Sequence, residues 1–132
     1  MQSLIQIPPV STKALWAGRI ISTVPILLML FGAVVKLVRT PSVIQGFAQY
    51  GYADHLIVPV GIIELVSTIV YLIPRTSVLG AILLTAVMGG AVTTNIRVGN
   101  PAFVMPIILG LFIWGGLYFR DQRLRDLLPL RT

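Results

Sequence analysis

The chain has 132 residues, of which 56% are hydrophobic and only 11% are charged, and its formal net charge is +6. A soluble domain of this size buries too little surface to hide so many apolar side chains, so the composition excludes an ordinary soluble fold and indicates a membrane protein. Cysteine is absent, which excludes disulfides, thiol nucleophiles and cysteine-ligated metal or iron–sulfur sites.

Four long apolar runs predict four transmembrane helices. Each run is long enough to cross a bilayer, and backbone polar groups in lipid must form their hydrogen bonds within the segment itself. The predicted spans cover about residues 15–38, 56–74, 76–97 and 101–119. We therefore expect an all-α fold, a bundle of four transmembrane helices with antiparallel neighbours, in a single domain over residues 1–132.

The basic residues predict the orientation of this bundle. An even number of spans places both termini on one side, and most of the cations lie on that side. They are Lys13, Arg19, Arg75, Arg120, Arg123, Arg125 and Arg131, against Lys36, Arg39 and Arg97 on the other side. The positive-inside rule then predicts cytoplasmic termini in a multi-pass protein of the cell membrane. The cations do not cluster among aromatic residues, so we expect the lipid bilayer as their partner and no nucleic acid.

Two segments outside the spans carry further predictions. Thr40–His55 is the only long connection, and its aromatic residues suit the outer membrane interface. The basic tail, residues 120–132, places Leu124, Leu127 and Leu128 on one helical face, which predicts a short helix lying on the inner leaflet. A disordered basic tail is the alternative.

Small residues recur every four positions in the third span, at Ala81, Thr85, Gly89 and Thr93, with Gly90 beside them. Helices in lipid associate closely where small residues let their backbones approach. We therefore expect this face to be a contact between helices.

Glu64 is the only acidic residue within a predicted span. It lies eight residues beyond Leu56, which is about 12 Å into the membrane at about 1.5 Å per residue. An ionised carboxylate at such a depth costs at least about 2.5 kcal/mol. A cation, a proton or water must therefore stabilise it.

The directions of side chains provide candidate partners for Glu64. Side chains lean toward the N-terminus of their own helix, so Lys36 and Arg97, near the outer ends of neighbouring spans, can lean inward toward Glu64. We expect a polar intramembrane ligand site, and its predicted residues are Glu64, Lys36, Arg97, Asn95, Tyr52 and His55. The site is a functional pocket or a purely structural polar clamp. A rival arrangement has both cations snorkelling to the surface and Glu64 protonated beside a hydroxyl group.

The sequence contains no motif for catalysis or metal binding. His55 is the only histidine, so no metal or haem site is expected. Motifs of hydrolases, zinc proteases and phosphate-binding loops are also missing. We predict no catalytic residues and no catalytic activity of the chain on its own.

A set of short motifs along the chain resembles the DoxX-like family of small bacterial four-helix membrane proteins. In chain order the motifs are Gly18-Arg19, Gly32 to Lys36, Gly51-Tyr52, Gly61, Glu64, Tyr71-x-x-Pro74-Arg75-Thr76, Gly80-Ala81, Gly89-Gly90-Ala91 with Arg97, Trp114-Gly115-Gly116-Leu117 and Arg120-Asp121. The family takes its name from a subunit of an archaeal thiosulfate:quinone oxidoreductase. The resemblance, which covers nearly the whole chain, implies a link to quinone or redox chemistry, with a membrane oxidoreductase as partner.

Three functional hypotheses follow. In the first, the chain is an accessory or binding subunit whose polar site holds a quinone, with Lys36, Arg97 or Tyr52 donating hydrogen bonds to the quinone carbonyls. In the second, it is a small proton-coupled transporter that uses Glu64. In the third, it is a scaffold whose glycine-rich faces recruit partner helices or a second copy of the chain.

Overall fold

The computed structural model describes residues 10–127, and this part of the chain is helical with no strand. Its elements are α1 (Thr12–Leu37), α2 (Pro41–Gln49), η2 (Asp54–Leu56), α3 (Ile57–Leu72), η3 (Pro74–Thr76), α4 (Ser77–Arg97), η4 (Pro101–Phe103), α5 (Val104–Arg120) and α6 (Gln122–Leu127). With their 3₁₀ extensions, four of the helices are long and apolar enough to cross a membrane. The prediction of an all-α bundle with four transmembrane helices is therefore confirmed.

Local side-chain chemistry determines where several helices begin. The side chain of Ser11 accepts a hydrogen bond of 3.2 Å from the backbone N–H of Ala14 and so caps α1. The side chain of Asn100 does the same for the backbone N–H of Ala102, at 2.9 Å, just before the helical turn that leads into α5. Proline at the first position of this turn has no N–H that would need a partner. The Asn-Pro pair thus starts the fourth span.

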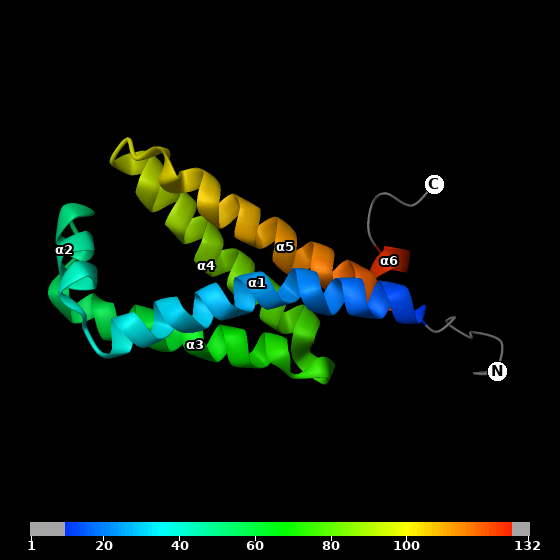
Figure 1. Cartoon of the computed structure of the whole chain (residues 1–132). Helices are drawn as coiled ribbons and strands as arrows, with labels where there is room; N and C mark the ends of the chain where they lie inside the picture. Colours follow the sequence, from blue (N-terminus) through cyan, green and yellow to red (C-terminus); the bar gives the residue numbers. More distant parts are fainter. Residues whose placement is uncertain (1–9, 128–132) are drawn as a thin grey trace.

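The four long helices form two pairs (Figure 1). Helix α1 runs beside α3, and α4 runs beside α5, while α1 also packs against α5. The two pairs diverge toward α2. We call the end that holds α2, η4 and the end of α1 the loop end. We call the end that holds the start of α1, η3 and α6 the terminal end.

In the described part of the chain, more large apolar side chains are exposed than buried. Its core side chains include Tyr71, Leu84 and Ile113, each at most 1% exposed. Large apolar residues such as Phe31 (67%) and Leu111 (66%) lie on the outside. Within the most hydrophobic window of each span, only 22–33% of the residues are buried. A surface of this kind is stable in lipid and not in water, so the fold is that of a membrane protein.

The long connection and the tail both contain helices. In the connection, Pro41 begins α2 after an extended Thr40, and no residue of this helix is buried. In the tail, α6 covers the predicted helical segment, but Leu124 is only 7% exposed and packs into the core of the bundle. This leucine therefore fastens α6 to the bundle, where the sequence predicted contact with the inner leaflet. Leu128, the third leucine of the predicted face, lies outside the described residues.

The glycines of the helices divide into close contacts and open positions. A Cβ added at Gly80 would lie 2.2 Å from the backbone nitrogen of Tyr71, so α3 and α4 touch there through their backbones. Cβ atoms added at Gly89 or Gly90 would meet no atom within 4 Å. The predicted helix contact is present in the first half of this face, where Ala81 is fully buried and Thr85 accepts a hydrogen bond of 2.7 Å from Nε1 of Trp114 on α5. Gly89 and Gly90, further along α4, contact no other helix within the described chain.

Candidate functional site

The most unusual pair of side chains in the membrane-spanning part is Lys36 with Glu64. The ammonium nitrogen of Lys36, in the last turn of α1, lies 2.5 Å from Oε2 of Glu64, in the middle of α3. The Glu64 side chain is 7% exposed and that of Lys36 is 21% exposed. A carboxylate in this setting, left without a partner, would cost about 2.5–3.5 kcal/mol on insertion scales. The ion pair provides the stabilising cation.

The direction of the lysine side chain brings the pair together. The ammonium group also donates to the carbonyl oxygen of Gly32, one turn earlier in α1, at 3.4 Å. The side chain therefore runs back along its own helix toward the middle of the span, as side chains of helices generally do. The acidic and the basic group meet because α1 and α3 are antiparallel neighbours.

Two glycines make room for the ion pair between α1 and α3. A Cβ added at Gly32 would lie 2.6 Å from Oε1 of Glu64. A Cβ added at Gly61 would lie 2.9 Å from the Cβ of Lys36 and 3.3 Å from the carbonyl oxygen of Ala33. Larger residues at either position would displace a charged side chain or separate the helices. Both glycines thus belong to the structure of the site.

Arg97 does not join this ion pair. Its guanidinium group donates to the carbonyl oxygen of Tyr50 and lies over the ring of Tyr52, with 5.6 Å between Cζ and the ring centroid. The Tyr52 hydroxyl is also 2.6 Å from Oγ1 of Thr94. Gly51, between the two tyrosines, has a φ of +79° and forms the turn that presents this carbonyl. Arg97 thus fastens the connection to the end of α4.

Asn95 belongs to the same group at the loop end. Its Oδ1 accepts a hydrogen bond of 2.8 Å from the Tyr50 hydroxyl, and its Nδ2 donates to the carbonyl oxygen of Ala91 at 2.8 Å. The Tyr50 hydroxyl also accepts from Nδ2 of Asn100 at 3.2 Å. Asn95 thus joins Tyr50 to α4 through Oδ1, while its Nδ2 bonds to the backbone of its own helix.

His55 lies in η2 and is exposed. Within the described residues it forms no hydrogen bond or ion pair, and no group of three or more candidate metal ligands occurs there. The adjacent Asp54 instead pairs with Arg39 at 2.5 Å, both on the exposed surface of the loop end. The six predicted site residues therefore fall into three groups. These are the ion pair of Lys36 with Glu64, the group that joins the connection to α4 (Tyr52, Asn95 and Arg97), and the exposed His55.

A second polar cluster, outside the six predicted site residues, lies at the terminal end. Tyr71 is fully buried, and its hydroxyl donates to the carbonyl oxygen of Ile113 at 2.8 Å and lies 3.0 Å from Oγ of Ser22. Arg120 donates to the same hydroxyl at 3.0 Å and places its Cζ 5.3 Å from the ring centroid. Tyr71 follows Glu64 by seven residues on one face of α3, and this spacing is a sequence signal for the cluster.

The model of the DoxX-like family matches residues 20–116, which is most of the chain and includes Lys36, Glu64 and Arg97. No curated protein and no solved structure matches the chain significantly.

Proposed function

The chain belongs to the DoxX-like family of membrane proteins, and we propose that it is a binding or accessory subunit whose Lys36–Glu64 pair holds the polar head of a quinone-like molecule. In this proposal, Glu64 positions the ammonium group of Lys36, and Lys36 donates a hydrogen bond to a quinone carbonyl. A membrane oxidoreductase would be the partner that reduces or oxidises the bound molecule.

The observation that carries this proposal is the unused capacity of the lysine. An ammonium group has three N–H donors. Here two acceptors are in reach, Oε2 of Glu64 and the more distant carbonyl oxygen of Gly32, and the side chain is 21% exposed. In a helix surrounded by lipid, that exposed part is accessible to molecules dissolved in the membrane. A quinone carbonyl is an acceptor of suitable size and polarity for the third donor.

Quinone binding tests this proposal. We expect the protein in lipid nanodiscs to bind decylubiquinone saturably. We expect the double variant Lys36→Met with Glu64→Gln, which lacks both charges but leaves neither one buried alone, to bind it about 10- to 100-fold more weakly, as the loss of a charge-assisted hydrogen bond of about 1.5–3 kcal/mol predicts.

A matched control separates this site from a general effect of charge. Lys13 is exposed at the other end of α1, so Lys13→Met removes the same group and should leave binding unchanged. Equal affinity of the double variant and the parent protein would refute the proposed site.

One further observation favours the alternative function, proton-coupled transport. Beyond Glu64, the side chains of Ser67, Thr68 and Tyr71 continue along α3 toward the terminal end, each at most 3% exposed. Thr68 donates to the carbonyl oxygen of Glu64 at 2.8 Å. A buried carboxylate within a membrane span is typical of proton-coupled transporters, and these hydroxyl groups continue its polar face toward the terminal end. Uptake of tetraphenylphosphonium into proteoliposomes, driven by a pH gradient and abolished in Glu64→Gln, would favour transport over quinone binding.

The third hypothesis, a scaffold for partner helices, is supported by Gly89 and Gly90, which have open space beside them on α4. In this case we expect no saturable quinone binding and no transport. Because the chain contains no cysteine, Gly90→Cys introduces a single thiol, and a disulfide-linked dimer formed in the membrane would point to self-association through α4.

A further inference from the structure

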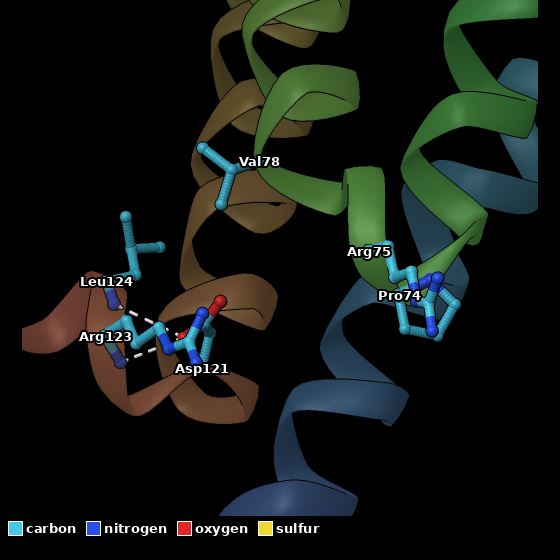
Figure 2. A pocket seen from close by; sticks show the side chains of 6 residues that line it. All are labelled: Pro74, Arg75, Val78, Asp121, Arg123 and Leu124. Atoms are coloured by element: carbon cyan, nitrogen blue, oxygen red, sulfur yellow. Dashed lines mark hydrogen bonds between the residues drawn. The ribbon is translucent and has the colours of Figure 1, made fainter. Parts of the chain in front are cut away.

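The terminal end contains a pocket of about 530 Å³ whose walls come from two parts of the chain that are distant in sequence (Figure 2). One wall is the turn between α3 and α4, and the other is the corner between α5 and α6. The lining residues are Pro74, Arg75, Val78, Asp121, Arg123 and Leu124. A pocket of this volume is in the range that holds small molecules.

We propose that this pocket binds the phosphodiester headgroup of an anionic phospholipid. It lies where one membrane span begins, at Pro74, and another ends, at Arg120, which is the level of lipid headgroups in a bilayer. Basic pockets between transmembrane helices bind the headgroups of anionic lipids. The proposal is independent of the Lys36–Glu64 pair, which lies nearer the loop end.

The charges of the lining residues favour an anion. In the described part of the chain, the ion pairs are Lys36–Glu64 and Arg39–Asp54, so the guanidinium groups of Arg75 and Arg123 have no carboxylate partner there. Figure 2 shows Arg123 directed across the α5–α6 corner, whereas Arg75 lies on the opposite wall with its guanidinium turned outward. Arg75 is exposed, so its flexible side chain can turn toward a bound phosphate.

Asp121 does not cancel this positive charge fully. Its Oδ1 accepts hydrogen bonds from the backbone N–H groups of Arg123, at 2.9 Å, and Leu124, at 3.4 Å (Figure 2). These bonds hold the carboxylate at the start of α6. With two arginines and one aspartate, the lining keeps a net charge of +1.

The apolar lining favours a lipid over a free phosphate. Pro74 and Val78 provide apolar surface on one side and Leu124 on the other, suited to the glycerol and upper acyl region of a phospholipid. Leu124 is only 7% exposed and belongs to the core, so it holds α6, and with it the backbone of Arg123, in place. The pocket thus combines two exposed arginine side chains, one on each wall, with apolar surface between them.

Native mass spectrometry of the full-length protein tests the proposal, with phosphatidylglycerol and phosphatidylcholine as probes. We expect one phosphatidylglycerol to be retained in preference to phosphatidylcholine. In the double variant Arg75→Ala with Arg123→Ala, its affinity should fall at least about tenfold below that of a control with the same loss of charge. The control is Lys13→Ala with Arg19→Ala, which removes two exposed cations of α1 at the same end and outside the pocket.

Each outcome of this experiment decides the proposal. Equal affinity of the pocket variant and the control would overturn it, because the attraction would then come from the general charge of the terminal end. Competition of inorganic phosphate or glycerol 3-phosphate at the affinity of the lipid would also overturn it, since the site would then bind a free anion.

If the pocket variant fails to fold, lipid affinity in Arg123→Lys serves instead, since lysine keeps the charge and loses the planar fork. Affinity equal to the parent in Arg123→Lys would contradict a bound phosphodiester, and a several-fold loss would support one.

Discussion

Lys36→Met is expected to destabilise the protein by about 3 kcal/mol, because it leaves the carboxylate of Glu64 buried without its cation. Methionine has nearly the shape of the lysine stem, so the change removes the charge and the hydrogen bond to Oε2 while keeping the packing against Gly61. The free energy of unfolding, measured by denaturant titration in detergent micelles, is the quantity to compare with the parent protein.

The two single substitutions should differ in size. Glu64→Gln leaves Lys36 without its partner, but this lysine lies in the last turn of α1 and is already partly exposed, so it can extend toward the headgroup region. We therefore expect a smaller loss, about 1 kcal/mol, for Glu64→Gln. Combined with Lys36→Met, it should restore stability to within about 1 kcal/mol of the parent, because no isolated buried charge remains. Additive losses in the double variant would show that the pair is not energetically coupled.

The sequence predicts the spans and the Lys36–Glu64 pair because simple one-dimensional rules govern both. Apolar runs of sufficient length form transmembrane helices, since lipid leaves the backbone no other way to satisfy its polar groups. Antiparallel helices whose side chains lean toward their own N-termini bring a lysine near the end of one helix close to an acid in the middle of the next. Neither rule requires knowledge of a loop.

The position of Arg97 depends on a loop and could not be predicted in this way. It donates to the backbone carbonyl of Tyr50, and every residue has such a carbonyl. Only the turn at Gly51, with its positive φ, directs that oxygen toward α4. A sequence reveals a glycine that permits such a turn but does not say which neighbour the turn faces.

The Tyr71 cluster and the open face of α4 were missed for a related reason. Small residues mark positions where helices can approach, and Gly80 and Gly89 look alike in sequence. Their roles differ because α3 packs against one face of α4 only, at the turn that joins the two helices. The same contact buries Tyr71 beside Arg120, more than forty residues away in the chain. Which of two similar faces is covered is a property of the packed bundle.

Gly80→Ala should therefore be severely destabilising, by about 3 kcal/mol, whereas Gly89→Ala should stay within about 1 kcal/mol of the parent. At position 80 the new Cβ would lie 2.2 Å from the nitrogen and 2.3 Å from the Cα of Tyr71, and backbone atoms cannot move aside as a flexible side chain can. Helices α3 and α4 would have to separate, which also disturbs the hydrogen bond of 2.9 Å from Oγ of Ser77 to the carbonyl oxygen of Tyr71.

The two alanine variants form a matched pair, because both add one methyl group to α4 and both replace glycine by a better helix former. Unfolding in detergent micelles measures the stability of each bundle on its own. Equal stability of the two variants there would contradict the close contact at Gly80. A Gly89→Ala variant that is stable in micelles but loses stability in the membrane would instead show that the open face of α4 packs against another chain there, since a methyl group facing lipid disturbs nothing.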